Sequence, residues 1–280
     1  MITSGIQSKF EPVQWKKHFF GVTQKRWAFL NGKSVWITGA GTGYGRCLAV
    51  ALAAAGAKVF LTGRREDKLQ ETINEMKRFD VPTDRCYKII ADITNFDQAS
   101  EACKKVADLS DSLYGLINNA ALPSRGDIKR PLLDGSIDDW QKIMATNVTA
   151  PWFLTRTIFP HMAKGGTSRV LFVSSEAGWA FTPGFGSYNV SKAALNNLSA
   201  SLAAECATSY PEADTQMNVL VPGEARTEMN QGSLESPYKI VGMALALLSH
   251  PKGGPNGRFF YWDGRHSFFC YASPYEISLL

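Results

Sequence analysis

The sequence predicts an α/β protein with a mostly parallel sheet in a single domain, and two observations carry this prediction. First, short apolar stretches suited to buried strands alternate along the chain with longer stretches of helical character. Second, no linker rich in Pro, Gly and Ser divides the 280 residues. A chain of this length buries a sizeable core, and its hydrophobic fraction of 45% is ordinary for a globular protein.

Composition argues against several other classes of protein. The longest nearly apolar run, residues 47–57, is too short to span a bilayer, and we expect no secretory signal at the N-terminus. Five scattered cysteines and four histidines without metal-ligand spacing predict reduced thiols, a cytoplasmic location and no metal site. The formal charge of +5 is interleaved with acidic residues, which favours an anionic small molecule over nucleic acid as the partner.

Three regions are expected along the chain: an N-terminal extension (1–30), a main domain (31–265) and an aromatic C-terminal tail (266–280). The extension mixes aromatic and basic side chains around Trp15 and Trp27. Such a mixture suits a membrane surface, a contact with another subunit, or a strap across the domain's own surface. Gly21 interrupts any long amphipathic helix, which favours the strap.

The first predicted strand, residues 34–37, leads into a glycine-rich turn and then a helix-favouring segment, residues 46–53. Glycines allow a tight turn and a close backbone approach, so phosphate oxygens can meet the N–H groups at the start of the helix. Glycine spacing is weak evidence by itself. Because a strand precedes it and a helix follows it, this loop predicts a phosphate-binding site.

The second predicted strand, residues 58–62, ends just before Arg64 and Arg65. In a dinucleotide-binding domain the adenosine ribose lies at this point, where an acidic residue suits a free 2′-hydroxyl and cations suit a 2′-phosphate. Guanidinium groups bind phosphate in a forked geometry. The sequence therefore favours NADP(H) over NAD(H), with Arg64 as the first contact and Arg65 as the second. The alternative is that both arginines are solvated or paired with Glu66 and Asp67.

Further strands follow the same pattern, with polar residues at their ends, where open α/β sheets bind ligands. Asp92 ends the third strand and is equally suited to cap the next helix. A long helix begins near Asp138, and Asn147 inside it is unfavourable by propensity and would normally face solvent. Residues 228–238 form a short polar lid candidate. The predicted strands are 87–92, 113–120, 170–173, 217–221 and 258–262, and a helix is expected at 68–79.

The stretch 175–192 predicts the reaction centre. The strand at 170–173 delivers Ser175 to the carboxyl edge of the sheet, and a helix-like segment opens at Tyr188. Because four residues make about one helical turn, Tyr188 and Lys192 share a face. An adjacent ammonium favours the phenolate; lowering the tyrosine pKa from about 10 to about 7 would take roughly 4 kcal/mol from the ammonium and a cationic cofactor ring. Such a phenol exchanges protons near neutral pH.

These motifs resemble the short-chain dehydrogenase/reductase family, in the expected order, over roughly residues 33–264. The likeness rests on the Thr-Gly-x-x-x-Gly-x-Gly loop that begins at Thr38, on Ser175, on the Tyr-x-x-x-Lys spacing, and on the Pro-Gly-x-x-x-Thr that begins at Pro222. The resemblance implies a doubly wound, Rossmann-type fold with helices on both faces, residues 31–265 being an NADP-binding catalytic domain. It also implies reversible hydride transfer between NADP(H) and a carbonyl/alcohol pair, and a homo-oligomer, either a dimer or a tetramer.

The resemblance assigns roles to the matching residues. Tyr188 would be the general acid/base, Ser175 would hold the substrate carbonyl, and Lys192 would bind the nicotinamide ribose and lower the tyrosine pKa. Asn147 would distort its helix and hold a water that links Lys192 to solvent, and Asp92 would contact the adenine. The implied catalytic residues are Asn147, Ser175, Tyr188 and Lys192. The implied cofactor contacts are Thr38, Gly39, Gly43, Tyr44, Gly45, Arg64, Arg65, Asp92, Asn119, Ala120, Tyr188, Lys192, Pro222, Gly223 and Thr227.

The substrate is not predicted. Trp179, Phe181 and Phe185 would suit a ring or an acyl chain if they line a pocket, but they suit the core or a subunit contact equally well. Glu224 stands where the family more often has an apolar residue. Two alternative functions are a catalytically silent NADP(H)-sensing protein on the same fold and a sugar-nucleotide epimerase-type enzyme. The intact Ser, Tyr, Lys and Asn disfavour the first, and the glycine spacing and the short region after Pro222 disfavour the second.

Overall fold

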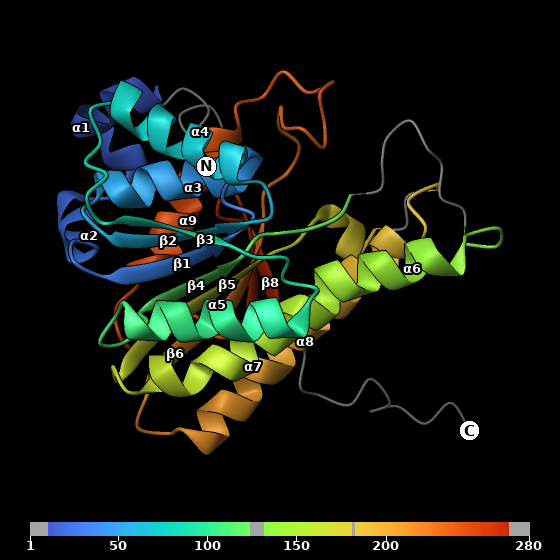
Figure 1. Cartoon of the computed structure of the whole chain (residues 1–280). Coiled ribbons are helices and arrows are strands. Elements are labelled where there is room, and N and C mark those ends of the chain that lie inside the picture. Colours follow the sequence, from blue (N-terminus) through green and yellow to red (C-terminus); the bar gives the residue numbers. More distant parts are fainter. Residues whose placement is uncertain (1–10, 124–131, 181–182, 269–280) are drawn as a thin grey trace.

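The computed structural model describes residues 11–123, 132–180 and 183–268, and these contain one eight-stranded sheet. The strand order is β3-β2-β1-β4-β5-β6-β7-β8, with β1 to β7 parallel and β8 antiparallel to β7. Helices cover both faces of the sheet (Figure 1). The doubly wound α/β prediction is therefore confirmed. The strands are β1 (Ser34–Thr38), β2 (Lys58–Gly63), β3 (Cys86–Ile90), β4 (Gly115–Asn118), β5 (Thr167–Val173), β6 (Asp214–Val221), β7 (Arg258–Tyr261) and β8 (His266–Phe268).

The helices alternate with the strands, as the sequence pattern predicts. In the described part of the chain, none of them combines the length and the apolar character needed to cross a membrane. The α-helices are α1 (Trp15–His18), α2 (Gln24–Phe29), α3 (Gly43–Ala54), α4 (Glu66–Arg78), α5 (Phe96–Asp108), α6 (Ile137–Met144), α7 (Ala150–Ala163), α8 (Ser187–Ser209) and α9 (Val241–Leu248). Shorter helical turns are η2 (Pro12–Gln14), η3 (Phe19–Gly21), η4 (Ala145–Thr149), η5 (Glu176–Gly178) and η6 (Pro237–Ile240).

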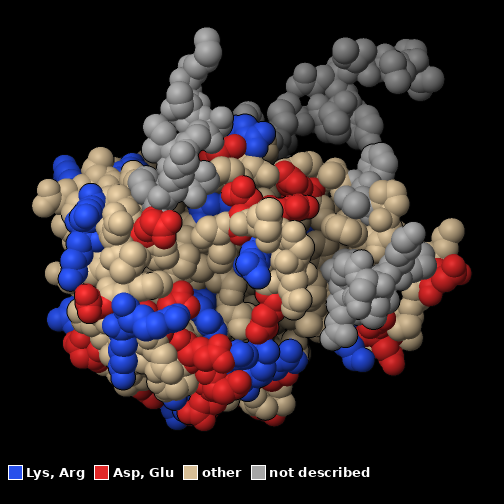
Figure 2. Space-filling model, turned by 90° about the horizontal axis from the view of Figure 1, so that it is seen from above, with Lys and Arg blue, Asp and Glu red and all other residues tan. Residues whose placement is uncertain are grey.

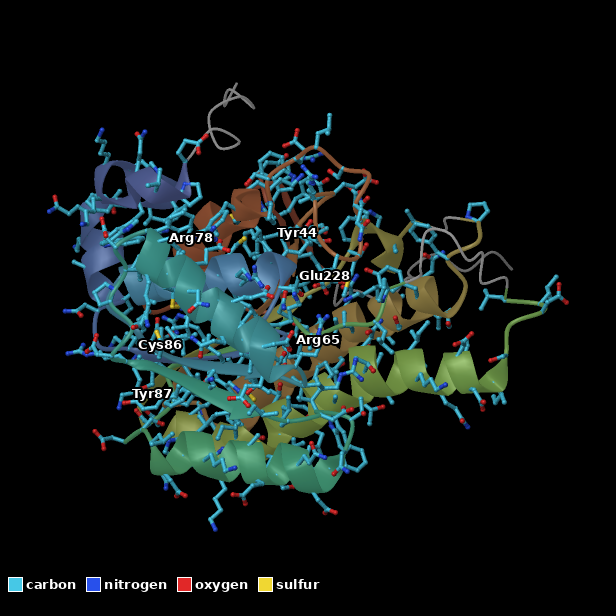
Figure 3. All side chains as sticks on the ribbon, turned by 45° about the horizontal axis from the view of Figure 1, so that its top comes forward. Tyr44, Arg65, Arg78, Cys86, Tyr87 and Glu228 are labelled. Atoms are coloured by element: carbon cyan, nitrogen blue, oxygen red, sulfur yellow. The ribbon has the colours of Figure 1, made fainter. Side chains whose placement is uncertain are left out.

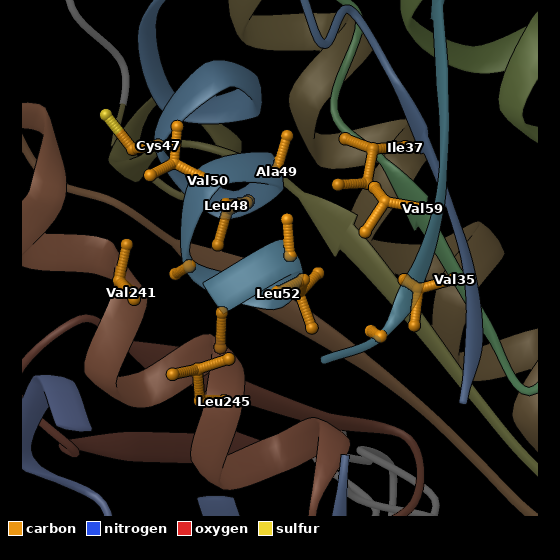
Figure 4. Close-up of a cluster of buried hydrophobic side chains, with 14 of the residues drawn as sticks. Val35, Ile37, Cys47, Leu48, Ala49, Val50, Leu52, Val59, Val241 and Leu245 are labelled. Atoms are coloured by element: carbon orange, nitrogen blue, oxygen red, sulfur yellow. The ribbon is translucent and has the colours of Figure 1, made fainter. Parts of the chain in front are cut away.

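Two apolar layers, one on each face of the sheet, hold this arrangement together. In the first, shown in Figure 4, Leu48 and Leu52 of α3 pack with Val35 of β1 and with Val241 and Leu245 of α9. Strands buried on both faces read as nearly continuous apolar runs, which is why the central strands were recognisable in the sequence. The packing of α3 against β1 fixes the helix start beside the carboxyl end of that strand.

The second layer lies on the other face of the sheet, where α5, α7 and α8 pack. Leu154 of α7 and Leu195 of α8 belong to the same buried cluster as Val170 of β5 and Val219 of β6. This packing anchors α8 along its length. The first turn of α8, which carries Tyr188, is thereby held next to the end of β5.

The chain reverses its direction of winding between β1 and β4. These two strands are neighbours, with Val35 opposite Gly115 and Ile37 opposite Ile117. From β1 the chain builds outward to β2 and β3, and from β4 it builds the other way. The loops that leave β1 and β4 therefore diverge, and such a reversal is where doubly wound sheets bind ligands.

The described part of the N-terminal extension packs on the protein's own surface. The Trp15 ring stacks on Trp27 with centroids 5.7 Å apart, and the Trp15 indole N–H donates to the carbonyl oxygen of Phe79 at 2.9 Å. Phe20 stacks on Tyr238 at 5.9 Å and 9°. The extension therefore joins the end of α4 to η6, as in the strap alternative.

We expect Phe20→Ala to lower the free energy of unfolding by about 3–5 kcal/mol, because a fully buried aromatic side chain is removed. Phe20 is 1% exposed, and its φ of +50° lies in the left-handed region, which the ring packing must hold in place. Urea unfolding followed by circular dichroism measures the change. Val13→Ala, at a residue 59% exposed in the same extension, is the control and should change stability little. A loss below about 1 kcal/mol in Phe20→Ala would contradict the strap.

The C-terminal region begins differently from the expected tail. Residues 266–268, which the sequence analysis assigned to the tail, form β8 against β7. A turn at Gly264, with φ of +92°, lets the Tyr261 N–H donate to the carbonyl oxygen of Arg265 at 2.7 Å. The His266 ring then stacks on Phe260 at 5.5 Å. The rest of the expected tail, 269–280, lies outside the described residues.

Candidate functional site

The predicted site residues come together at the carboxyl edge of the sheet. Most of them come from the ends of the six strands β1 to β6 or from the segments that follow these ends. Asn147 comes from the helical turn η4, and Tyr188 and Lys192 come from α8. Such an edge is where the backbone groups that terminate parallel strands and the starts of the following helices are available to a ligand. Residues that are far apart in the sequence thus form one continuous site.

Thr38 organises the centre of this edge. Its hydroxyl accepts hydrogen bonds from the backbone N–H groups of Asn119 and Ala120, both at 3.1 Å. The Asn119 side-chain amide donates in return to the carbonyl oxygens of Thr38 at 2.9 Å and Gly39 at 3.2 Å. The glycine loop and the exit of β4 are therefore tied into one unit.

The glycines of the loop are required by close contacts. A Cβ at Gly45 would lie 2.2 Å from the carbonyl oxygen of Gly39, and a Cβ at Gly39 would lie 2.9 Å from the Cα of Ala120. Gly39 and Gly43 also have positive φ values of +65° and +51°. Any side chain at these positions would push the loop away from the sheet.

The start of α3 fits the phosphates of a dinucleotide. The first helical hydrogen bond runs from the Arg46 N–H to the carbonyl oxygen of Thr42, and no side chain caps the helix there. The N–H groups of residues 43–45 are therefore directed out of the helix, where they can bind an anion. The residues present thus suit NAD or NADP, as the sequence analysis expects of this loop.

Tyr44 links the two sides of the site. Its hydroxyl donates to the carbonyl oxygen of Gly223, at the end of β6, over 2.7 Å. Burial raises the pKa of Tyr44 above its ordinary value, with further contributions from the nearby Tyr188 and Glu224. Tyr44 is therefore a neutral donor that fixes the Pro222-Gly223 turn against the glycine loop. This contact was not predicted from the sequence.

Both arginines after β2 have acidic partners, but not the ones considered in the sequence analysis. Arg64 Nη1 lies 3.6 Å from Asp92 Oδ2, and Arg65 Nη2 lies 2.7 Å from Glu228 Oε2. Neither pairs with Glu66 or Asp67 among the described contacts. All four side chains keep part of their surface in solvent, so a phosphate has access to both guanidinium groups. Of these residues, Arg65 and Glu228 are labelled in Figure 3.

Asp92 is held in a turn rather than as a helix cap. Its Oδ1 accepts from the Thr94 N–H at 2.9 Å and from the Thr94 hydroxyl at 2.7 Å. Burial acts to raise the pKa of Asp92, but these hydrogen bonds and the charge of Arg64 bring it below the ordinary value. Asn95 caps α5 instead, which corrects the alternative that Asp92 is the N-cap.

Ser175 and Tyr188 converge, as predicted. Their side chains lie near each other, close enough for the Ser175 hydroxyl to lower the pKa of the phenol. The Ser175 hydroxyl also accepts from the N–H of Ala177 at 3.2 Å, which fixes its position at the start of η5. Two hydroxyl groups thus meet at the end of β5, the arrangement needed to bind and protonate one carbonyl oxygen.

Lys192 lies behind the tyrosine, one turn further along α8. Its amine is 5.6 Å from the centroid of the Tyr188 ring and donates to the carbonyl oxygen of Val173 at 3.0 Å. Burial lowers the pKa of the Lys192 ammonium to about 8. At neutral pH the group is mostly charged, and it can exchange protons at mildly alkaline pH.

The pKa of Tyr188 is raised in this structure, and Lys192 alone does not produce the expected lowering, which also counted on a cationic cofactor ring. Burial raises the pKa of the phenol, and the nearby Ser175 hydroxyl offsets only part of that rise. Lys192 does not compensate, because its amine is directed to the carbonyl of Val173. Tyr188 is therefore a neutral phenol, the form that can donate a proton.

Asn147 distorts its helix, as the family resemblance implies. Residues 145–149 form a π-helical turn, η4, between α6 and α7. Asn147 is fully buried rather than solvent-facing; its amide donates to the carbonyl oxygen of Leu122 and to the Ser191 hydroxyl, both at 3.0 Å, and its carbonyl accepts from the Leu122 N–H at 2.7 Å. Asn147 thus joins the segment after β4 to the residue that precedes Lys192. The water that it was expected to hold is untested.

The segment after β6 closes the site on its other side, and we call residues 222–236 the β6–η6 segment. Gly223 has a φ of +66°, which allows the turn after Pro222. Thr227 pairs with Asn230 through two backbone hydrogen bonds of 3.2 Å. A Cβ at Gly43 would lie only 3.1 Å from the Thr227 side chain, so the segment packs directly on the glycine loop.

The candidate substrate-side aromatic residues differ in their placement. Trp179 is 57% exposed, which rules out a place in the core. Phe185 packs edge-on against Tyr188 with centroids 6.2 Å apart, and Phe181 lies outside the described residues. Phe185 is therefore the one described member of this group with a contact to the reaction centre.

Two supporting contacts were missed in the sequence analysis. The Ser174 hydroxyl donates to the Asn196 side chain at 2.6 Å, which ties the end of β5 to α8. A Cβ at Gly178 would lie 2.4 Å from the same asparagine side chain, so only glycine fits beside α8 there. The four-residue spacing of Lys192 and Asn196 on one helix face was the available signal. Among the described residues, no group of three or more His, Cys, Asp or Glu side chains is placed to hold a metal ion.

Comparisons with known proteins agree with this geometry. Residues 33–237 match the family model described as short chain dehydrogenase. An uncharacterized oxidoreductase of Thermotoga maritima is 35% identical over 197 residues, which cover 70% of this chain and 73% of the relative. Gluconate 5-dehydrogenase of Gluconobacter oxydans is 28% identical over 84% of this chain and 94% of its own. The NADP complex of a Shigella flexneri protein described as a short chain dehydrogenase has a TM-score of 0.75 and 25% identity, covering 84% of this chain and 98% of the other.

Proposed function

Because the chain belongs to the short-chain dehydrogenase/reductase family of NAD(P)-dependent oxidoreductases, we propose that it transfers hydride reversibly between NADP(H) and a carbonyl/alcohol substrate. The observation that carries the proposal is the convergence of the Ser175 and Tyr188 side chains at the end of β5, with the Lys192 amine 5.6 Å from the centroid of the phenol ring. These groups lie beside a loop that suits dinucleotide phosphates. A proton donor, a carbonyl-binding hydroxyl and a proton reserve are thus assembled in one place.

In the direction of reduction, each side chain has a separate task. Ser175 donates a hydrogen bond to the substrate carbonyl oxygen and holds it beside the phenol. A nicotinamide bound beside these groups would supply the hydride. Tyr188 gives its proton to the oxygen as negative charge develops there, and Lys192 returns a proton to Tyr188. Asn147 holds the helix that carries Lys192 in register through Ser191.

The preference for NADP(H) rests on the cations at the end of β2. Arg64 and Arg65 are adjacent, partly exposed and placed where a 2′-phosphate is bound in doubly wound folds. The acidic residue that would suit a free 2′-hydroxyl is missing from the end of this strand. The NADP complex of the Shigella flexneri protein supports the same preference.

We expect Arg64→Ala to weaken NADPH binding about tenfold or more and NADH binding less than about threefold. In the proposed complex the Arg64 guanidinium binds the 2′-phosphate, and its loss would also leave the Asp92 carboxylate without its cationic partner. Fluorescence titration of both cofactors measures the change. Arg78→Ala is the matched control, because Arg78 is an exposed arginine at the far end of α4 (Figure 3). This substitution should change the binding of neither NADPH nor NADH. Equal losses for both cofactors would point to NAD(H).

The reaction itself is tested by following NADPH absorbance with a panel of ketones, aldehydes and alcohols, including sugar acids, steroids and acyl thioesters. Turnover of any member supports the proposal and names the substrate class. Tight NADPH binding without turnover across the panel would favour the silent cofactor-sensing alternative. On the face shown in Figure 2, Lys and Arg lie among Asp and Glu, which supports a small-molecule substrate over nucleic acid.

Assembly and compartment are further parts of the proposal. Trp140 of α6 and Trp152 of α7 are each 38% exposed, and Phe96 of α5 is 48% exposed, so large apolar side chains remain available for a contact between subunits. We propose a homo-oligomer, a dimer or a tetramer, which light scattering after gel filtration tests. The four cysteines among the described residues are free thiols, which supports a reducing compartment such as the cytoplasm.

A further inference from the structure

We propose that Glu228 is a specificity-determining residue, because its carboxylate competes with the 2′-phosphate of the cofactor for Arg65. The inference rests on the proposed use of NADP(H). It adds Glu228, which lies far from β2 in the sequence, to the residues that set the cofactor preference. Glu228 belongs to the β6–η6 segment, and Arg65 stands at the N-cap position of α4 after β2, where its side chain makes no capping hydrogen bond. The sequence separates them by 163 residues, and the fold brings them into contact.

The contact is a direct ion pair. Arg65 Nη2 donates to Glu228 Oε2 at 2.7 Å, the distance of a strong charge-assisted hydrogen bond. The side chains are 55% and 48% exposed, so water and ligands reach both of them. Figure 3 shows Arg65 and Glu228 together on the same side of the molecule as Tyr44. The pair therefore connects the end of β2 with the segment that covers the glycine loop.

The backbone holds Glu228 in this place. The residue before it, Thr227, makes two backbone hydrogen bonds with Asn230 and packs on Gly43. Further along, the Arg226 N–H donates to the carbonyl oxygen of Glu235 at 2.8 Å. The β6–η6 segment is thus closed on itself, and the Glu228 carboxylate stays near the end of β2 when Arg65 turns to another anion.

The two arginines therefore differ in how readily they can bind a phosphate. Arg64 lies at 3.6 Å from a carboxylate that Thr94 already binds, so Arg64 can turn to a phosphate at small cost. Arg65 must leave a shorter and better-formed pair. A phosphate that binds Arg65 also comes close to the Glu228 carboxylate, and like charges repel. Both effects weaken the binding of NADP(H). They leave the binding of NAD(H) unchanged, because NAD(H) carries no 2′-phosphate.

The test is Glu228→Gln in the full-length protein, with cofactor binding measured by fluorescence titration. The variant keeps the size of the side chain and a hydrogen-bond acceptor but removes the charge. We expect NADPH to bind about five- to tenfold more tightly and NADH to change less than about twofold. The affinity for adenosine 2′,5′-bisphosphate should rise as the affinity for NADPH does. The affinity for adenosine 5′-monophosphate, which lacks the 2′-phosphate, should stay the same. Glu101→Gln, which removes a carboxylate from an exposed ion pair on α5, is the matched control.

A double-variant cycle separates competition from a merely structural role. In an Arg65→Gln background the gain from Glu228→Gln should disappear, because the group for which the two anions compete is gone. Unchanged or weaker NADPH binding in Glu228→Gln, or an equal gain for NADH, would overturn the inference. A failure of the NADP(H) proposal would give a different result from a failure of this inference. In that case Arg64→Ala would weaken the binding of NADPH and NADH equally.

Discussion

Tyr188→Phe is expected to lower kcat by about a thousandfold or more, within the range that a general acid contributes, while NADPH binding changes less than about twofold. The substitution removes one oxygen and leaves a ring that packs edge-on against Phe185. Because burial raises the pKa of Tyr188, the phenol is protonated at neutral pH and its loss removes the proton that carbonyl reduction needs. The partner hydroxyl of Ser175 then has no acid beside it.

Single-turnover and steady-state kinetics with the best substrate of the screen measure this effect, and a cofactor titration checks that binding survives. Tyr87→Phe is the control: it removes a phenol oxygen from β3, which lies at the far edge of the sheet (Figure 3). It should leave kcat unchanged. If Tyr188→Phe kept more than about a tenth of the wild-type kcat, another group would have to be the acid.

Lys192→Met is expected to abolish most of the activity and at the same time to stabilise the fold at neutral pH. Burial lowers the pKa of the ammonium from 10.5 to about 8, so the charged form opposes folding. That shift corresponds to a cost on the order of 3 kcal/mol for the charged form in the folded protein. Methionine fills the same space without a charge, so we expect Tm to rise by a few degrees at pH 7.

The stability difference between Lys192→Met and the wild-type protein should depend on pH. Below about pH 8 the lysine is charged in both the folded and the unfolded state, and the wild-type protein carries the full cost of burying it. As the pH rises from about 8 to 10.5, the folded form loses its proton first and the cost disappears. The stability advantage of Lys192→Met should therefore shrink over this window. Lys58→Met is the control, and a variant less stable than wild type at pH 7 would contradict the argument.

Much of the fold could be predicted from the sequence because the decisive signals are local. Parallel strands buried on both faces are continuous apolar runs, as the burial of β1 and β6 shows. Helix periodicity placed Tyr188 and Lys192 on one face of α8. Asn147 was recognised as unusual inside a helix, and a π-helical turn is found there. The family resemblance then placed the strand ends at one edge.

The ionisation of Tyr188 could not be predicted in the same way. The sequence gives the spacing of the phenol and the ammonium but neither their burial nor the direction of the lysine side chain. The structure directs that side chain to the carbonyl of Val173 and encloses the phenol, so the pKa of Tyr188 is raised, whereas the expected fall counted on a cofactor ring as well as on the ammonium. Desolvation is a property of the whole packed site and outweighs a single neighbouring charge.

By itself, the sequence determined the α/β class and predicted the dinucleotide-binding loop and the roles of Ser175, Tyr188 and Lys192, because these depend on patterns a few residues long. Only the tertiary structure decided that Glu228 pairs with Arg65, that Phe20 stacks on Tyr238 and that Tyr44 fixes Gly223. These contacts join segments that lie far apart in the sequence, and no helix or strand periodicity relates residues at such separations. They exist because the packed sheet brings the ends of its strands to a common edge.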